Sequence, residues 1–194
     1  MILALDIGNT NVVLGCIADG EILFTERMAT DSGKTELDYA ISLKMVLELR
    51  EIKVNEITGA IIGSVVPPVT SLMREAIRKV TGQEALVVNV DMNIGLEVLM
   101  DNPSSVGTDL IVGAVAGINR YPVPLILIDM GTATTICVVN ENKQYIGGMI
   151  LPGAVVSSDS LISRTAQLQK VAFEVPKSLS LIHISEPTRP ISIS

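Results

Sequence analysis

Aromatic and basic residues are both scarce in this 194-residue chain. Aromatic residues make up 3% of it, tryptophan is absent, and 14 Lys and Arg stand against 21 Asp and Glu, for a net charge of −7. Nucleic-acid binding relies on basic side chains that neutralise phosphates and on aromatic rings that stack on bases. We therefore expect no nucleic-acid partner, although an acidic protein can still bind a small phosphorylated ligand.

Long apolar runs and clustered metal-binding residues are missing as well. No stretch reaches the roughly 18 consecutive apolar residues that a membrane span needs, and the N-terminus lacks the basic start of a signal peptide. We expect a cytoplasmic protein with no membrane partner. The two cysteines, Cys16 and Cys137, lie in separate apolar runs, which predicts buried free thiols. The single histidine, His183, lies near the C-terminal end.

One sequence pattern occurs twice, 123 positions apart. Residues 2–13 read ILALDIGNTNVV and residues 125–136 read LILIDMGTATTI. Each copy has an apolar run that ends in Asp, a Gly two residues later, short polar residues and a second apolar run. The correspondence continues without a gap into the next turn, where Asp19-Gly20 matches Asn142-Lys143. We infer a duplicated domain core.

Each copy predicts a strand, a tight polar turn and a second strand. Gly8 and Gly131 allow a turn that presents backbone N–H groups and short hydroxyls, which suits phosphate oxygens. Asp6 and Asp129, at the strand ends, can hold a cation or its water shell. Two ordinary hairpins, in which Asp and Gly only shape the turns, are the alternative. The second copy favours a pair of turns that hold a polyphosphate from both sides.

The rest of the chain alternates strand and helix patterns, typical of an α/β protein with mixed sheets covered by helices. Thr35 and Asp38 have the spacing of a capping box at the start of a helix. The helical repeat of Leu37, Ile41, Met45 and Leu49 predicts its buried face. We expect strands at residues 2–7, 11–17, 21–27, 58–66 and 85–90, and helices at 69–80 and 110–121. In the last helix, Gly113 and Gly117 are spaced for close packing against another element.

The repeat divides the chain into three predicted parts. Residues 1–124 form a first domain, and residues 125–178 begin a duplicated second domain that is cut short. Residues 179–194, LSLIHISEPTRPISIS, lose the patterned character of the rest and resemble the translated end of a library adapter. We expect them to be a non-native tail and exclude them from the fold.

Five motifs, in this order, resemble those of the type III pantothenate kinases, members of the acetate kinase, sugar kinase, Hsp70 and actin superfamily. The resemblance covers residues 1 to about 178. The motifs are DIGNTN at 6–11, SVVPP at 64–68, NPSSVGTD at 102–109, DMGTATT at 129–135 and GGMILPG at 147–153.

The resemblance implies a fold and an activity. The fold is a pair of duplicated ribonuclease H-like, or actin-like ATPase, domains, of which the second is incomplete here. The activity is ATP-dependent phosphorylation of pantothenate to 4'-phosphopantothenate, the first step of coenzyme A biosynthesis. Magnesium and either potassium or ammonium are the implied ions. The family also implies a homodimer, with the substrate pocket and the helix of Gly113 and Gly117 near the interface. It implies further substrate and nucleotide contacts beyond residue 178, so we expect the 194-residue chain to be inactive alone.

The resemblance also assigns residues. Asp109 becomes the general base, Asp129 the ligand of the monovalent cation, and Asp6 a ligand of magnesium through water. The implied ATP-binding residues are Asp6, Ile7, Gly8, Asn9, Thr10, Asn11, Val12, Val13 and Thr132, and the implied substrate-binding residues are Met100, Gly107, Thr108, Asp109 and Leu110.

Two positions depart from the family pattern. Leu110 stands where the family often has Arg, and Met100 where it has Tyr, so contacts suited to an anionic, hydroxyl-rich substrate are lost. Taken alone, Asp109 is also explained as a carboxylate at a helix start, where the helix dipole favours it. Two alternatives therefore stay open: a non-catalytic transcriptional accessory factor on the same fold, and a kinase for another small hydroxyl substrate.

Overall fold

A computed structural model describes residues 1–92 and 94–165 of the chain. The residues Met1–Val156 belong to one unit that contains two β-sheets, and a second unit begins at Ser157. Within the described residues no helix has the length and apolar character required to cross a membrane. The predicted tail, residues 179–194, and its His183 lie outside the described part.

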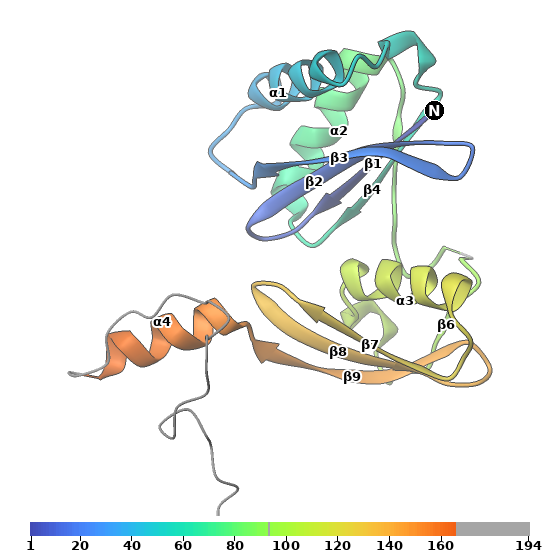
Figure 1. Cartoon of the computed structure of the whole chain (residues 1–194), viewed down its shortest axis with the longest axis vertical. Helices are drawn as coiled ribbons and strands as arrows, with labels where there is room; N and C mark the ends of the chain where they lie inside the picture. Colours follow the sequence, from blue (N-terminus) through green and yellow to red (C-terminus); the bar gives the residue numbers. More distant parts are fainter. Residues whose placement is uncertain (93, 166–194) are drawn as a thin grey trace, which may run out of the picture. The chain divides into compact units, whose positions relative to one another are not determined.

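The first sheet contains five strands in the order β3-β2-β1-β4-β5 (Figure 1). Strands β1, β2 and β3 are antiparallel neighbours, whereas β4 and β5 run parallel to β1, so the sheet is mixed as predicted. The predicted strand at 85–90 is shorter than expected. The bounds are Ile2–Ile7 for β1, Asn11–Ala18 for β2, Glu21–Ala29 for β3, Gly59–Ser64 for β4 and Ala85–Val87 for β5.

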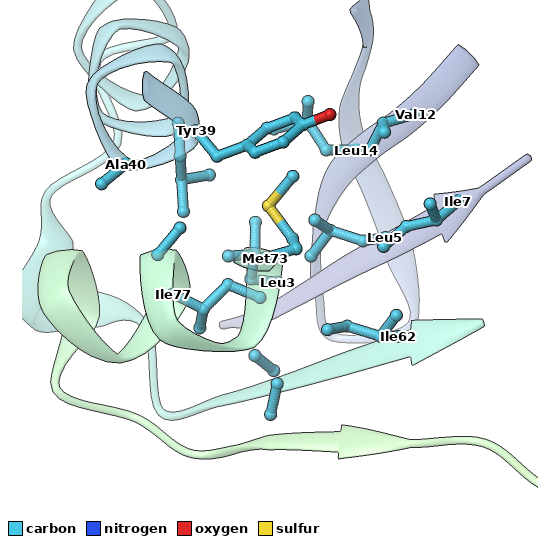
Figure 2. Close-up of a cluster of buried hydrophobic side chains, with 14 of the residues drawn as sticks. Leu3, Leu5, Ile7, Val12, Leu14, Tyr39, Ala40, Ile62, Met73 and Ile77 are labelled. Atoms are coloured by element: carbon cyan, nitrogen blue, oxygen red, sulfur yellow. The ribbon is translucent and has the colours of Figure 1, made fainter. Parts of the chain in front are cut away.

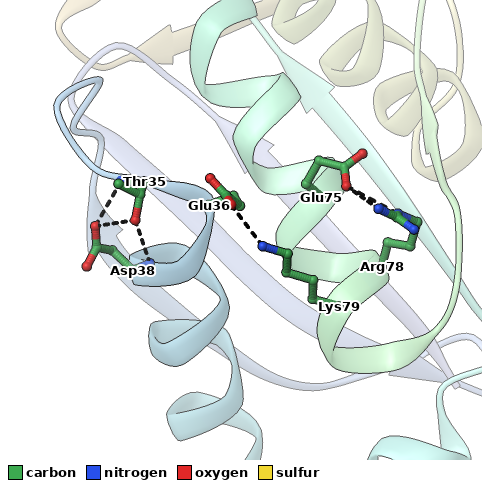
Figure 3. Close-up of polar contacts among 6 residues, drawn as sticks. All are labelled: Thr35, Glu36, Asp38, Glu75, Arg78 and Lys79. Atoms are coloured by element: carbon green, nitrogen blue, oxygen red, sulfur yellow. Dashed lines mark hydrogen bonds and ion pairs between the residues drawn. The ribbon is translucent and has the colours of Figure 1, made fainter.

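Two helices, α1 (Glu36–Leu49) and α2 (Pro67–Thr81), lie side by side on one face of this sheet (Figure 1). The short 3-10 helix η1, at Val54–Glu56, precedes β4. Pro67 and Pro68 open α2, because proline fits the first helical turn, where no N–H partner is needed. An ion pair of 2.9 Å between Glu36 and Lys79 joins the two helices (Figure 3).

Alternate residues of β1 and β2 make the first hydrophobic core with these helices. Leu3, Leu5 and Ile7 of β1 face the helices, and Tyr39 of α1 and Met73 of α2 pack over them (Figure 2). The Tyr39 ring is fully buried, yet its hydroxyl donates to the Asp31 carbonyl oxygen at 2.9 Å and accepts from the Asp31 N–H at 3.0 Å. This pair of hydrogen bonds fixes the rotation of α1 about its own axis.

The predicted core face of α1 is wrong, although its predicted start is confirmed. Thr35 and Asp38 form the capping box (Figure 3). Leu37, Ile41, Met45 and Leu49 are 51–77% exposed, and the buried residues are Tyr39, Ala40, Leu43 and Leu47. Both sets repeat every four residues along the helix, so spacing alone does not choose between them. The tyrosine, anchored by Asp31, turns the second set inward.

The second sheet has the order β6-β9-β8-β7 and packs against helix α3. Its β7-β8-β9 strands are antiparallel neighbours, like β1-β2-β3, which supports the duplication. The bounds are Glu97–Val98 for β6, Thr108–Arg120 for α3, Leu125–Met130 for β7, Ala133–Val139 for β8 and Gln144–Pro152 for β9; the 3-10 helix η2 at Pro103–Ser105 precedes α3, and α4, at Ala154–Arg164, follows β9.

The two hairpins differ in register by one residue. Ile7 pairs with Val12 across the first turn, but Met130 pairs with Thr134 across the second, so the second turn is one residue shorter. A one-residue change of register moves every side chain of a strand to the other face. Accordingly Ile126, Ile128 and Met130 are 62–78% exposed, whereas their counterparts in β1, Leu3, Leu5 and Ile7, are buried.

Helix α3 belongs to the core of the second sheet. Ile111, Ala114 and Ile118 are buried with Cys137 and Val139 of β8. The fold class is therefore confirmed as α/β with mixed sheets. The predicted domain boundary at residue 124, which assigns α3 to the first domain, stays a prediction.

Close packing explains Gly117 within this chain. A Cβ atom there would lie 2.7 Å from Leu127 Cδ2 and 3.3 Å from Leu125 Cδ1, both on β7, whereas a Cβ atom at Gly113 would meet nothing within 4 Å. The predicted close approach is thus made at Gly117, against β7. It needs no partner subunit, so the homodimer stays a prediction that the glycines do not support.

The corrected face of α1 can be tested with two leucines of the same helix. We predict that Leu43→Ala lowers the free energy of unfolding by about 2–5 kcal/mol, because it empties a fully buried site. Leu37→Ala, at an exposed position, is the matched control and changes it by less than about 0.5 kcal/mol. Urea unfolding followed by circular dichroism measures both. Equal losses would contradict the assignment of the faces.

Candidate active site at the two Asp-Gly turns

The turns of the two hairpins line one cavity of about 320 Å³. Gly8 to Asn11 come from the first turn and Gly131 to Ala133 from the second. A second cavity, of about 290 Å³, adds Leu110, Val112 and Gly113 of α3. Asp6, Asp109 and Asp129 line both cavities, so the structure brings together the three carboxylates that the sequence singled out.

Hydrogen bonds hold each turn and join the two. The Gly8 N–H donates to the Asn11 carbonyl oxygen, and the Gly131 N–H to that of Ala133, both at 2.9 Å. Thr10 Oγ1 and Thr132 Oγ1 are 2.8 Å apart and hydrogen-bonded. The two copies of the motif therefore meet at their hydroxyl groups, on the wall of the cavity they share.

The first turn is also tied to the end of β3. Thr30 Oγ1 donates to the Gly8 carbonyl oxygen at 2.7 Å, and the Thr30 N–H donates to the Thr10 carbonyl oxygen at 3.0 Å. These bonds fix the backbone of the turn before any ligand arrives. A preformed turn loses little conformational entropy on binding.

Asp6 lies where the electrostatic conflict is greatest. Its pKa is raised above the usual range, first by partial desolvation in the cavity and then by the negative charges of Asp109 and Asp129. The residue as a whole is still exposed, so solvent screens part of this repulsion. A cavity that gathers three carboxylates gains from a cation.

These carboxylates suit a metal ion that arrives with a phosphate ligand. Within residues 1–92 and 94–165, no three His, Cys, Asp or Glu side chains converge closely enough to hold one ion. Magnesium does not require this, because it is commonly bound by one or two carboxylates, waters and substrate phosphates. The donor set therefore fits magnesium bound with a nucleotide.

Asp109 is the second residue of α3, as expected for a carboxylate at a helix start. Its Oδ1 atom accepts a hydrogen bond from the Leu110 N–H at 2.9 Å. A Cβ atom at Gly107 would clash with this oxygen. Gly107 therefore leaves the space that the Asp109 carboxylate occupies.

The cavities include most, but not all, of the predicted site residues. Ile7 and Val12 are fully buried in the first core, so their side chains face away from the site. Met100, Gly107 and Thr108 line neither of the two cavities, and the Met100 sulfur lies near Gly147. The predicted residues that do line one or both are Asp6, Gly8, Asn9, Thr10, Asn11, Val13, Asp109, Leu110, Asp129 and Thr132.

Sequence reasoning missed Arg27, Val65 and Thr135, which also line the larger cavity. Arg27 lies on β3 directly opposite Val13 of β2. The pairing of β2 with β3 through the Asp19-Gly20 turn was the signal that could have located it. Thr135 could have been found from the second copy of the motif, where it ends the run TATT.

Comparison with known proteins identifies the family. A model of the type III pantothenate kinase family matches residues 2–188. The chain belongs to this family. The matched region runs past Ser178 into the predicted tail, outside the part of the chain that the structure describes.

One relative agrees with this assignment, and one solved structure shares the fold. The chain is 41% identical over 179 residues to a type III pantothenate kinase from Finegoldia magna, covering 92% of this chain and 68% of that protein. It also resembles the crystal structure of a Baf family transcriptional activator from Campylobacter jejuni, with a TM-score of 0.51 and 16% identity over 93% of this chain and 70% of the other. The second likeness is one of fold alone.

The repulsion at Asp6 predicts a gain in stability when its charge is removed. Because the folded-state pKa is raised, the contribution of Asp6 to stability is greatest at low pH and is lost as the pH rises through that pKa. We predict that Asp6→Asn raises the ligand-free melting temperature at pH 7, and that the difference from wild type shrinks as the pH falls into the range where Asp6 is protonated. Calorimetry across pH measures this.

Asp19→Asn, in the β2-β3 turn away from the cavity, is the matched control. It removes one carboxylate of the same kind and should not reproduce the pH-dependent gain. A lower melting temperature for Asp6→Asn at pH 7 would contradict the repulsion.

Proposed function

We propose that this protein uses ATP to phosphorylate pantothenate to 4'-phosphopantothenate, the first step of coenzyme A biosynthesis. Membership of the type III pantothenate kinase family supports this reaction. The single observation that carries it is the shared cavity, in which two phosphate-type turns meet the three carboxylates Asp6, Asp109 and Asp129. Phosphoryl transfer needs this combination of positioning and charge neutralisation.

Both turns bind the nucleotide phosphates under this proposal. The hydroxyls of Thr10 and Thr132 are hydrogen-bonded to each other at 2.8 Å, so the one that accepts in this pair keeps its proton to donate to a phosphate oxygen. The turn of Gly8 to Asn11 offers backbone and amide donors beside them. Asp6 would hold magnesium, which would supply positive charge beside the phosphate oxygens when bound.

Asp109 accepts the proton of the reacting hydroxyl. Its carboxylate lines both cavities and keeps its Oδ1 atom oriented through the Leu110 N–H. The Asp109 carboxylate takes the proton of the primary hydroxyl as the oxygen of that hydroxyl bonds to the γ-phosphorus. The bond from the γ-phosphorus to the β–γ bridging oxygen breaks, and ADP leaves with that oxygen.

The cavity wall next to Asp109 is apolar. It suits the part of the substrate that lies beside the reacting hydroxyl. Leu110, Val112 and Leu127 line the smaller cavity together with Asp109. In pantothenate the primary hydroxyl stands beside a carbon that carries two methyl groups. Apolar contacts with those methyl groups offset the loss of the arginine that the family often has at the position of Leu110.

The second copy of the motif binds the monovalent cation. Asp129 is the penultimate residue of β7, as Asp6 is of β1, and both line the same cavity. We assign potassium or ammonium to Asp129 and magnesium to Asp6. The active enzyme is a homodimer in the cytoplasm under this proposal.

The role of Asp109 predicts a loss of turnover with little loss of binding. In the intact enzyme Asp109→Asn keeps the shape but removes the base, so kcat should fall by about a hundredfold or more. The affinity for ATP should persist, which isothermal titration calorimetry measures. Asp19→Asn, outside both cavities, should leave kcat unchanged; wild-type turnover in Asp109→Asn would disprove the assignment.

The role of Asp129 predicts a dependence on monovalent cations. At fixed magnesium, turnover should be higher in potassium or ammonium chloride than in sodium chloride at equal ionic strength. Asp129→Ala should remove this preference, because the carboxylate that neutralises the ion is gone. Steady-state rates in the three salts measure it. A wild-type rate that is the same in all three would argue against the site.

A further inference from the structure

Arg27 reaches the cavity from the third strand of the first sheet. Asp6 of β1 pairs with Val13 of β2, and Val13 pairs with Arg27 of β3, so the three residues form one row across the sheet. Neighbouring strands are about 4.8 Å apart, which places the Cα atoms of Arg27 and Asp6 about 10 Å from each other. An extended arginine side chain spans most of that distance.

The alternation of β3 directs Arg27 toward the cavity side. Phe24 and Met28 pack against the first core, on the face covered by α1 and α2. Glu26 lies on that same face and pairs with Arg50, the residue that follows α1. Because successive side chains of a strand point to opposite faces, Arg27 points to the other one, where it lines the larger cavity.

The larger cavity is lined by one arginine and three carboxylates. Among the described residues that line it, Arg27 is the only basic one, against Asp6, Asp109 and Asp129. Within residues 1–92 and 94–165, the side chain of Arg27 has no hydrogen bond or ion pair, whereas that of Arg78 is paired with Glu75 at 2.5 Å. The guanidinium of Arg27 is therefore available to a ligand.

We propose that Arg27 binds the triphosphate of the nucleotide, donating charge-assisted hydrogen bonds to its phosphate oxygens from the β3 side of the cavity. This inference rests on the proposed function, because it takes the ligand to be ATP. A planar guanidinium donates two parallel hydrogen bonds to phosphate oxygens. Its positive charge also attracts a polyphosphate into a cavity that is otherwise lined by acidic groups.

A purely structural role for Arg27 makes a different prediction. If its charge only relieved the repulsion around Asp6 in the free protein, its removal would lower the melting temperature of the ligand-free protein and leave phosphate affinity unchanged. A phosphate contact has the opposite signature. Affinity then falls for ligands with a phosphate chain and stays the same for adenosine, while the ligand-free fold keeps its stability.

The test compares Arg27→Gln and Arg27→Lys with wild type in the intact protein. Isothermal titration calorimetry measures the binding of magnesium ATP, adenosine and inorganic tripolyphosphate. We expect Arg27→Gln to weaken ATP and tripolyphosphate about tenfold or more, the range for losing a hydrogen bond to a charged group. Adenosine should bind as before, and Arg27→Lys, which keeps the charge but not the planar fork, should fall between.

Arg74→Gln is the matched control, since Arg74 is an exposed residue of α2 that lines neither cavity of the site. In steady-state kinetics Arg27→Gln should raise KM for ATP more than it lowers kcat. The affinity of Arg27→Gln for ATP should also fall less steeply with salt concentration than that of wild type.

The outcomes separate this inference from the proposed function. Wild-type affinity of Arg27→Gln for both phosphate ligands overturns the role of Arg27, whatever the enzyme phosphorylates. Wild-type protein that binds ATP but does not phosphorylate pantothenate overturns the proposed reaction, and the Arg27→Gln comparison still decides the role of Arg27. Wild-type protein that binds neither ATP nor tripolyphosphate overturns both.

Discussion

Antiparallel pairing within two hairpins is the constraint on which the rest of this structure depends. The pairing of β1 with β2 and of β7 with β8 places an Asp near the end of the first strand and a Gly in the turn of each copy. Because the turns meet through Thr10 and Thr132, both aspartates face one cavity. The hairpin register also decides which face of each strand is buried, and so where α1, α2 and α3 pack.

The cavity concentrates negative charge at a cost to the folded state. The pKa of Asp6 is raised first by partial desolvation and then by the negative charges of Asp109 and Asp129, so the cavity disfavours its ionised form. Charge arranged in this way is typical of sites that receive cations and charged ligands, where stability is exchanged for function. Under the proposed function, magnesium and Arg27 would supply positive charge beside these carboxylates.

Helix α3 links the chemistry to the packing. Its first turn carries Asp109, with space provided by Gly107, and its buried face packs on β7 and β8, where Gly117 lets the helix approach Leu127. The position of the carboxylate therefore depends on the close contact between α3 and β7 near the other end of the helix. A rigid helix that is held at one end in this way keeps the carboxylate at its other end in place.

The sequence alone determined the repeat, the hairpins, the α1 cap and the identity of the residues at the turns, because each depends on local patterns of Gly, Asp, Thr and apolar residues. Only the tertiary structure decided the buried face of α1, where Leu37 and Leu43 belong to equally spaced sets and the hydrogen-bonded Tyr39 selects the second. It likewise decided that the second turn is one residue shorter, which exposes Ile128, and that Arg27 enters the cavity. These features arise from packing and strand register between distant segments, which local sequence patterns do not specify.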